Sequence, residues 1–260
     1  MEELSREWVG PLALWISRGH RFGTDAFLLS DFAGARRGER ACDLCAGCGI
    51  VPLLWFREEP FPQAAWGVEL LEEPFRLMER TLAENPGLAG RFFPVHRDLR
   101  QLEGVLPAGS MDLVTCNPPY NPPGRGIPAG TSHRRTARHQ EDCSPEELAG
   151  AAARLLRFGG RFCLCGRPQY LPGVMEALRG AGLEPKRLRL VQKLADTPPW
   201  LFLLEARRGG KPFLRVEAPL LMERPQGGFS PEVLRIYGKM SPAAAGMDSE
   251  KPAAAERSDP

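Results

Sequence analysis

Met111-Asp-Leu-Val-Thr-Cys116 runs directly into Asn117-Pro118-Pro119-Tyr120, and this junction is the most informative point of the sequence. The first six residues show no helical spacing of apolar side chains, so they predict a buried strand. The two prolines then stop regular structure, and Pro118 disfavours helical geometry at Asn117. We therefore expect Asn117 at the carboxyl end of a strand, which is the edge where open α/β sheets bind ligands.

The residue types at this edge suit the recognition of a flat molecule that carries an amino group. The side-chain oxygen of Asn117 and the backbone carbonyl beside Pro118 can accept the two amino hydrogens. The ring of Tyr120 can stack on the flat face, while Pro119 stiffens the turn. These four residues are therefore predicted to hold the target of a reaction.

Strand-like runs alternate with amphipathic segments on both sides of the junction. Strands are expected at residues 41–46, 65–70, 91–96, 111–116 and 160–165, and helices at 50–57, 72–85, 145–158 and 168–180. Ser144-Pro-Glu-Glu147 supplies an N-cap, a first-turn proline and a capping box for the third helix. Runs 186–192 and 200–206 would add an antiparallel pair at a sheet edge. The pattern predicts an α/β fold with a doubly wound, mostly parallel sheet of seven strands.

The chain divides into four parts by composition. Residues 1–40 form an N-terminal lead-in, residues 41–206 the α/β domain, and residues 207–240 an extension of it that opens with the basic segment Arg207-Arg-Gly-Gly-Lys211. Residues 241–260 are rich in Ala, Pro and Ser and poor in large apolar side chains, which is typical of disordered tails.

The overall composition is that of an ordinary globular protein. The chain has 260 residues, a net charge of +2 and 25% charged residues, enough to bury one substantial core. No apolar run has the length of a membrane-spanning helix, and the acidic start lacks the basic region of a signal peptide. We therefore expect a cytoplasmic protein in which any polyanionic partner is met by a local basic patch.

Seven cysteines bear on redox and metal chemistry. An odd number without a secretion signal argues against a disulfide framework. The spacing Cys42-x2-Cys45-x2-Cys48 could belong to a metal site, but these residues lie in an expected strand and its glycine turn, where small side chains are needed for packing. No histidine nearby completes a standard zinc spacing, so we expect no metal.

A second polar group follows the first expected strands. Asp43-Leu-Cys-Ala-Gly47-Cys-Gly49 joins a strand to a helix, and its glycines permit a tight turn and close approach of a ligand. Glu69 ends the next strand, where a carboxylate can accept both hydroxyl hydrogens of a ribose. Asp98 ends the third strand, where it could accept from an adenine amino group. Each feature also occurs where no ligand binds, but three at successive strand ends indicate a nucleoside site.

The glycine turn lacks the third glycine of the dinucleotide fingerprint, and Leu53 lies in the helix instead. A pyrophosphate needs the close helix approach that this glycine permits, whereas a nucleoside without phosphates does not. We therefore favour S-adenosylmethionine over NAD as the cofactor.

Together these motifs resemble class I S-adenosylmethionine-dependent methyltransferases that act on amino nitrogen, and among them the bacterial tRNA1(Val) adenine-37 N6-methyltransferase family. The order and spacing of the motifs at Asp43, Glu69, Asp98 and Asn117 carry the wider resemblance. Three segments narrow it: Arg21-Phe-Gly-Thr24-Asp25-Ala-Phe-Leu-Leu29, Thr136-Ala-Arg138-His-Gln-Glu141 and Phe229-Ser-Pro-Glu-Val-Leu-Arg-Ile-Tyr237. Cys45 stands where the family most often has glycine.

The resemblance, which covers about residues 15 to 238, implies roles for individual residues. The cofactor would be held by Asp43, Cys45, Gly47, Gly49, Glu69, Asp98 and Asn117. The target would be held by Asn117, Pro118, Pro119 and Tyr120. Thr24 and Asp25 would close over the amino-acid end of the cofactor, although the same two residues equally suit the capped start of a helix.

An RNA partner, in particular tRNA, is implied by the same resemblance. Residues 121–140 contain no acid and carry four arginines: Arg125, Arg134, Arg135 and Arg138. Cations beside the target site can bind phosphates that flank an inserted base, although a merely solvated loop has the same composition. Four further cations could extend the basic face or simply mark an exposed sheet edge: Lys186, Arg187, Arg189 and Lys193.

The expected reaction is methyl transfer to the exocyclic N6 of an adenine in RNA, with tRNA position 37 as the implied target. Hydrogen bonds from both amino hydrogens to Asn117 and the neighbouring carbonyl would make that nitrogen more nucleophilic, and in-line alignment would do much of the rest.

Three other functions share part of this pattern. Glutamine-N5 methylation of a protein uses the same amide-gripping motif, but such enzymes usually carry a helical domain ahead of the first motif, and only about 40 residues precede Asp43. A DNA adenine methyltransferase would usually need a target-recognition domain, for which we find no room. A non-catalytic RNA-binding module would not need the complete 117–120 motif.

Overall fold

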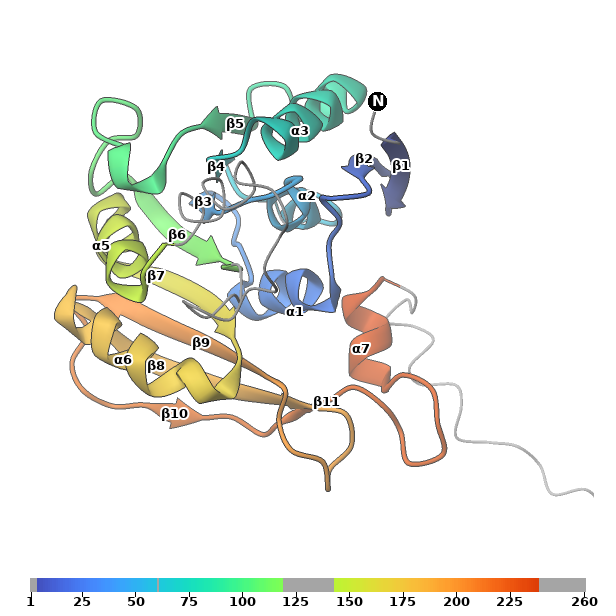
Figure 1. Ribbon diagram of the computed structural model, residues 1–260, viewed down its shortest axis with the longest axis vertical. Coiled ribbons are helices and arrows are strands. Elements are labelled where there is room, and N and C mark those ends of the chain that lie inside the picture. The colour runs from blue at the N-terminus through green and yellow to red at the C-terminus, as the bar shows by residue number, and fades with distance from the viewer. Residues whose placement is uncertain (1–3, 60, 119–142, 239–260) are drawn as a thin grey trace, which may run out of the picture.

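The computed structural model describes residues 4–59, 61–118 and 143–238 (Figure 1). The strands are β1 (Leu4–Val9), β2 (Leu12–Ser17), β3 (Arg40–Leu44), β4 (Ala64–Glu69), β5 (Phe92–His96), β6 (Met111–Cys116), β7 (Leu156–Gly166), β8 (Leu183–Gln192), β9 (Leu201–Arg208), β10 (Arg215–Val216) and β11 (Leu220–Leu221). The helices are α1 (Thr24–Ala33), α2 (Ile50–Trp55), α3 (Glu72–Glu84), α5 (Pro145–Leu155), α6 (Leu171–Gly180) and α7 (Pro231–Ile236), with 3-10 turns η1 (Pro86–Leu88), η2 (Leu99–Gln101) and η3 (Pro168–Tyr170).

The main sheet confirms the predicted α/β class. Within the described residues its strand order is β10-β8-β9-β7-β6-β3-β4-β5, with β11 also paired to β8. Neighbours from β7 to β5 are parallel, whereas β9 is antiparallel to both β7 and β8. Seven strands of five or more residues therefore form the predicted sheet, and the two-residue strands β10 and β11 extend it along the outer side of β8.

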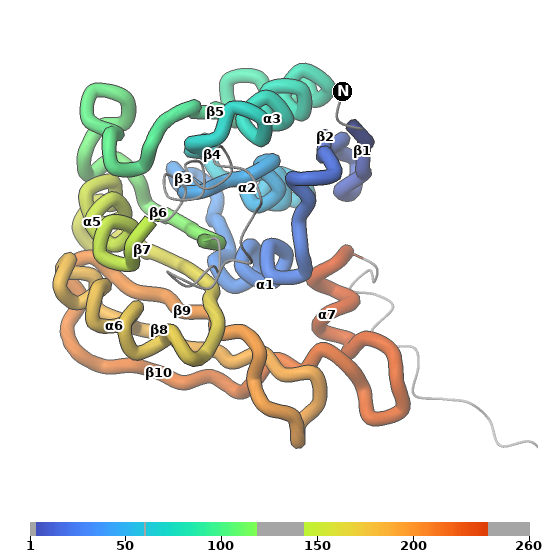
Figure 2. Tube along the Cα trace, viewed as in Figure 1, coloured from blue at the N-terminus to red at the C-terminus, as the bar shows by residue number. Residues whose placement is uncertain are grey.

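Two apolar cores lie on the two faces of this sheet. Leu113 and Val114 are neighbours in β6 and belong to different cores, as strand alternation requires. The core with Leu113 also contains residues of α1, α2 and α3, and the core with Val114 contains residues of α5 and α6. Figure 2 shows the corresponding separation, with α5 and α6 together on one side of the sheet. This double winding leaves the carboxyl ends of β3, β4, β5 and β6 side by side.

Two helix boundaries differ from the expectation. The helix expected at 145–158 ends at Leu155, because Leu156 is fully buried and pairs with Met111 as the first residue of β7. The helix expected at 168–180 begins as a 3-10 turn, and its α-helical part starts at Leu171 just before Pro172. The predicted capping box is confirmed: Ser144 Oγ accepts from Glu147 N at 3.2 Å, and Glu147 accepts from Ser144 N at 2.9 Å.

The lead-in contains a β-hairpin that the sequence did not predict. Strands β1 and β2 pair only with each other among the described residues and lie against α3. The buried Asn85 amide clamps the hairpin at Ala13: its oxygen accepts from the Ala13 N–H at 3.0 Å, and its nitrogen donates to the Ala13 carbonyl at 2.7 Å. Trp15 N–H donates to Thr81 Oγ1 at 3.0 Å. The hairpin thus depends on side chains about 70 residues further along the chain, which local sequence patterns do not reveal.

Helix α1 joins the lead-in to both the sheet and the C-terminal extension. Arg161, buried on β7, donates to the Ala33 carbonyl at the end of α1 at 2.5 Å and pairs with Glu39 at 2.9 Å. Figure 2 shows α7 beside α1, where Arg235 pairs with Asp31 at 2.8 Å. Within residues 4–59, 61–118 and 143–238, we find no helix long and apolar enough to cross a membrane.

Candidate functional site

A cavity of about 240 Å³ lies at the carboxyl edge of the central strands. Five of the predicted site residues line it: Cys45, Gly47, Glu69, Asp98 and Asn117. They come from the turn after β3 and from the ends of β4, β5 and β6, so residues up to 72 positions apart share one wall. The predicted convergence at this edge is therefore present in the fold.

The turn between β3 and α2 depends on backbone conformations that favour glycine. Gly47 has φ 56° and Gly49 has φ 83°, both in the left-handed region. At Gly49 a Cβ atom would also lie 2.8 Å from Met78 Cγ, so that position excludes side chains for two reasons. The turn is closed by Gly49 N–H, which donates to the Ala46 carbonyl at 2.9 Å.

Cys45 is strained in a way that residue size alone does not indicate. Its φ is 57°, which puts a non-glycine residue in the left-handed region. Such a conformation costs roughly 1 to 2 kcal/mol for a residue with a Cβ. The family preference for glycine at this position therefore has a backbone cause, and strain of this kind is typical of functional turns.

Glu69 is the central polar group of the pocket. It is 8% exposed, and its two carboxylate oxygens accept from different loops. One oxygen accepts from Gly47 N–H at 2.8 Å, and the other accepts from Leu71 N–H at 2.9 Å. Since a carboxylate offers about four lone-pair positions, each oxygen keeps capacity for a ligand hydroxyl.

Asp43 lies behind this turn and is 2% exposed. Its side chain accepts from Thr115 Oγ1 at 2.5 Å. Burial raises the pKa of Asp43 to about 7, the Thr115 hydrogen bond opposes this, and the negative charge of Glu69 adds to it. Neither Asp43 nor Glu69 has an ion-pair partner within the described part of the chain. A positive centre of a ligand would therefore be stabilised beside these two carboxylates.

Asp98 lines the pocket but already has a strong partner. Arg100 Nε lies 2.9 and 3.0 Å from its two oxygens, and a second guanidinium nitrogen lies 2.6 Å away. These hydrogen bonds lower the pKa of Asp98 and outweigh its partial burial. Arg100 also lies 3.5 Å from Glu147 at the start of α5. The contact of Asp98 with an adenine amino group stays a prediction. It would have to use those lone pairs of the Asp98 carboxylate that do not accept from Arg100.

Asn117 follows β6 on the wall of the pocket. Its side-chain oxygen accepts from the Cys165 thiol at 3.2 Å, and Cys165 is buried in the adjacent strand β7. The thiol is a weak donor that contacts the amide from the neighbouring strand. Pro119 and Tyr120 lie outside the described residues, as do the four predicted RNA-binding arginines Arg125, Arg134, Arg135 and Arg138; their roles stay predictions.

Thr24 and Asp25 are the first residues of α1, as the helix-start alternative expects, but the N-cap is Gly23 and no side chain caps the helix. Thr24 Oγ1 lies 2.8 Å from the Tyr237 hydroxyl, and Asp25 accepts from Ala26 N–H at 3.0 Å. Neither lines the described cavity, whereas His20 does. A role for Thr24 and Asp25 in cofactor binding remains a prediction.

Several lining residues were missed by the sequence analysis: His20, Leu71, Pro74, Arg97, Arg100 and Cys143. Leu71 and Arg97 lie within two residues of strand ends, where the strand ends alone could have identified them, whereas Arg100 lies in the 3-10 turn η2. His20 and Cys143 carry no such signal, because each approaches the pocket from a distant segment.

The cysteine spacing does not form a metal site. Cys42 belongs to the core on one face of the sheet and Cys48 to the core on the other, so their side chains point apart. No group of three His, Cys, Asp or Glu side chains that could hold a metal occurs within residues 4–59, 61–118 and 143–238.

The possible extension of the basic face along β8 stays a prediction, but most of its cations have carboxylate partners, as the alternative of an exposed sheet edge allows. Arg187 pairs with Glu205 and Glu217, and Arg189 donates to both oxygens of Glu232 at 2.7 and 2.9 Å. Lys193 lies 3.6 Å from Glu223. These cations are engaged in holding the sheet edge and α7, and only Lys186 has no carboxylate partner among the described residues.

The positive φ of Cys45 allows the effect of its backbone conformation on stability to be separated from the effect of its thiol. Cys45→Gly should be more stable to denaturant than Cys45→Ala by about 1 kcal/mol, because both remove the thiol but only alanine keeps a Cβ at positive φ. The control is Ala151→Gly in α5, which should lose stability by about 1 kcal/mol, as is usual in a helix. Equal stability of the two Cys45 variants would show that the turn relaxes at no cost.

Comparison with known proteins supports the sequence resemblance. No family model matches the chain. A curated tRNA1(Val) (adenine(37)-N6)-methyltransferase from Shewanella frigidimarina is 24% identical over 225 residues, which cover 86% of this chain and 85% of that protein. One from Pedobacter heparinus is 30% identical over 143 residues, but the match spans only 55% of this chain and 58% of that protein.

The fold has solved counterparts among methyltransferases. A protein from Agrobacterium tumefaciens described as a predicted O-methyltransferase superposes with a TM-score of 0.67 at 23% identity, over 82% of this chain and 95% of that one. At this identity the match shows the fold and not the substrate. The chain therefore has the fold of class I S-adenosylmethionine-dependent methyltransferases, and its sequence resembles bacterial tRNA1(Val) (adenine(37)-N6)-methyltransferases.

Proposed function

We propose that the chain transfers a methyl group from S-adenosylmethionine to the exocyclic N6 of an adenine in RNA, with tRNA position 37 as the target. The observation that carries this proposal is that Asn117 and Glu69 line one pocket at the carboxyl edge of the sheet. The names of the curated relatives, which are tRNA adenine-N6 methyltransferases, support the choice of substrate.

The residues at the ends of β3 and β4 fit this cofactor. Glu69 can accept the ribose hydroxyl hydrogens, while Gly47 presents bare backbone to the ligand with no atom within 4 Å of its missing Cβ. The buried charges of Asp43 and Glu69 have no cation among the described residues, so a ligand with a positive centre would relieve their repulsion. When bound, S-adenosylmethionine supplies an electrophilic methyl group on a positively charged sulfur.

Asn117 would orient and activate the nitrogen to be methylated. In the proposed reaction the side-chain oxygen of Asn117 accepts one amino hydrogen of the base, and a backbone carbonyl accepts the other. These hydrogen bonds favour a tetrahedral nitrogen whose lone pair is no longer shared with the ring. The base must leave its stack to reach the pocket. The nitrogen can release its proton after transfer, so no general base is required before attack.

Protein glutamine-N5 methylation is the rival function, since the same amide grip suits a glutamine side chain. The curated relatives favour RNA. In the proposed reaction the arginines of residues 121–140 would contact phosphates beside the inserted base.

The cofactor assignment predicts the effect of Glu69→Gln. The amide keeps the shape of the side chain but loses acceptor capacity and charge, so affinity for S-adenosylmethionine should fall about tenfold or more by calorimetry. The control Glu72→Gln removes an exposed carboxylate at the start of α3 and should leave affinity unchanged. Wild-type affinity in a folded Glu69→Gln protein would refute this role of Glu69.

The mechanism predicts a different result for Asn117→Ala. Turnover on RNA should fall by orders of magnitude while cofactor affinity survives, because the lost contacts strengthen chiefly in the transition state. The matched control is Gln192→Ala, which removes an amide on β8 that bonds the Thr197 carbonyl. Single-turnover rates that stay near the wild-type value in Asn117→Ala would overturn the mechanism.

A further inference from the structure

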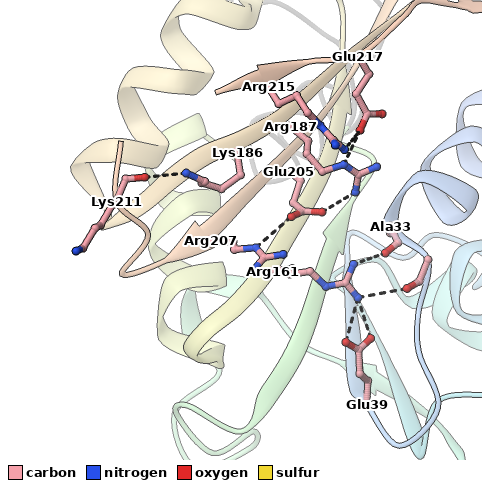
Figure 3. Close-up of polar contacts among 11 residues, drawn as sticks. Ala33, Glu39, Arg161, Lys186, Arg187, Glu205, Arg207, Lys211, Arg215 and Glu217 are labelled. Carbon is pink, nitrogen blue, oxygen red and sulfur yellow. Dashed lines mark hydrogen bonds and ion pairs between the residues drawn. The ribbon is translucent and has the colours of Figure 1, made fainter. Parts of the chain in front are cut away.

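The outer part of the sheet carries more cations than carboxylates. Three guanidinium groups, from Arg187, Arg207 and Arg215, share the two carboxylates of Glu205 and Glu217 (Figure 3). The N–O distances are 2.7 and 2.9 Å for Arg187, 3.3 Å for Arg207 and 2.6 Å for Arg215. Because three positive charges meet two negative ones, the network keeps an excess positive charge, and the side chain of Arg215 is 63% exposed.

Two more cations lie near this network. Lys186 Nζ donates to the Lys211 carbonyl at 2.8 Å, as Figure 3 shows. Neither Lys186 nor Lys211 pairs with a carboxylate of the described residues. No acid occurs in the sequence between Glu205 and Glu217, and Glu184, which lies opposite Arg207, is paired with Arg179. The local charge is therefore positive.

Two exposed aromatic rings accompany these cations. Phe158 is 77% exposed and Phe213 is 74% exposed. The Phe158 ring lies directly over Gly209, where a Cβ would come within 2.2 Å of the ring, and Lys186 Nζ lies 5.8 Å from the centre of the Phe213 ring. Large apolar rings at this exposure among cations are typical of surfaces on which unpaired bases stack.

This surface lies at the edge of the sheet away from the cofactor pocket. Strand β7 begins at Leu156 and reaches the pocket side at Cys165, which contacts Asn117. Phe158 lies near the start of β7, in the bulge between Leu156 and Arg161, whereas Cys165 lies near the other end of the strand. In Figure 1 the chain leaves β9 at the far end of the sheet and returns as β10. A ligand that touches both places must extend well beyond one nucleotide.

We propose that this surface, formed by Phe158, Lys186, Arg207, Lys211, Phe213 and Arg215 and here named the basic edge, binds the sugar-phosphate backbone of the substrate RNA outside the target loop. The proposal rests on the proposed function for the identity of the polyanion. Cations there neutralise phosphates, and the two rings contact exposed bases or sugars. The protein then selects a folded RNA over a short strand that presents the same adenine.

The test measures how the full-length protein binds and methylates two RNAs. One is a full-length tRNA1(Val) transcript, and the other is a stem-loop limited to its anticodon arm. The variant is Lys211→Ala/Phe213→Ala/Arg215→Ala, which removes exposed side chains from the basic edge. Its dissociation constant for full-length tRNA should rise about tenfold, and the slope of log K against log salt should fall by about 1.5, because two phosphate contacts are lost. Methylation of the stem-loop and affinity for S-adenosylmethionine should stay at wild-type values.

The control removes two cations of matched exposure, Arg76 and Lys193, whose side chains are 64% and 62% exposed. Arg76→Ala/Lys193→Ala should bind full-length tRNA as the wild type does. The single variant Lys211→Glu, which changes one exposed side chain, should give the same loss of tRNA affinity if the triple variant folds poorly.

The outcomes separate this proposal from the proposed function. Wild-type protein that methylates tRNA, together with a basic-edge variant that keeps the wild-type affinity and salt slope, overturns the basic edge alone. The basic-edge proposal is also overturned if the triple variant changes the oligomeric state, measured by sedimentation, and leaves tRNA binding unchanged. The basic edge would then be an interface between protein chains. Failure of the wild-type protein to methylate either RNA overturns the proposed function instead.

Discussion

The geometry of the pocket depends on one buried carboxylate that holds two loops. Glu69 accepts from Gly47 N–H and from Leu71 N–H, so it joins the turn after β3 to the loop after β4. Without that acceptor two backbone donors next to the pocket would lose their partner, at a cost of about 1 to 3 kcal/mol each. Cys45 and Asn117 reach the same pocket because β4, β3 and β6 are neighbours in the sheet.

The pocket combines buried carboxylates with exposed cations. Asp43 and Glu69 lie close enough for the charge of Glu69 to raise the pKa of Asp43, and neither has a cation partner within the described residues. Arg97 and Arg100 line the same pocket, and Arg100 pairs with Asp98. The pocket therefore presents both a carboxylate, from Glu69, and guanidinium groups to a ligand.

Sequence patterns were sufficient for the sheet and for the strand ends. The runs at β3, β4 and β6 have the apolar composition of strands buried on both faces. Ser144 and Glu147 form a capping box, which predicts a helix start. Parallel strands bring their carboxyl ends to one edge, so Glu69, Asp98 and Asn117 could be placed together without coordinates. Helix ends were predicted less accurately. The third predicted helix ends before Leu156, because Leu156 pairs with Met111 in β7, although the residues before it are helical.

Features that depend on distant partners could not be predicted. The β1–β2 hairpin is held by Asn85, and the lead-in helix by Arg161, both far along the chain. The left-handed conformation of Cys45 was hidden because its small size suited the motif. Arg100 and Asp98 are only two positions apart in the sequence, yet only the structure shows that they form a hydrogen-bonded ion pair.

The most direct test of the central claim is to identify the product. Purified protein should be incubated with methyl-labelled S-adenosylmethionine and an unmodified full-length tRNA1(Val) transcript, and the digested nucleosides analysed by mass spectrometry. The account predicts labelled N6-methyladenosine at position 37 and no label in protein glutamine. Label recovered as methylglutamine, or as a methylated nucleoside other than N6-methyladenosine, would contradict it.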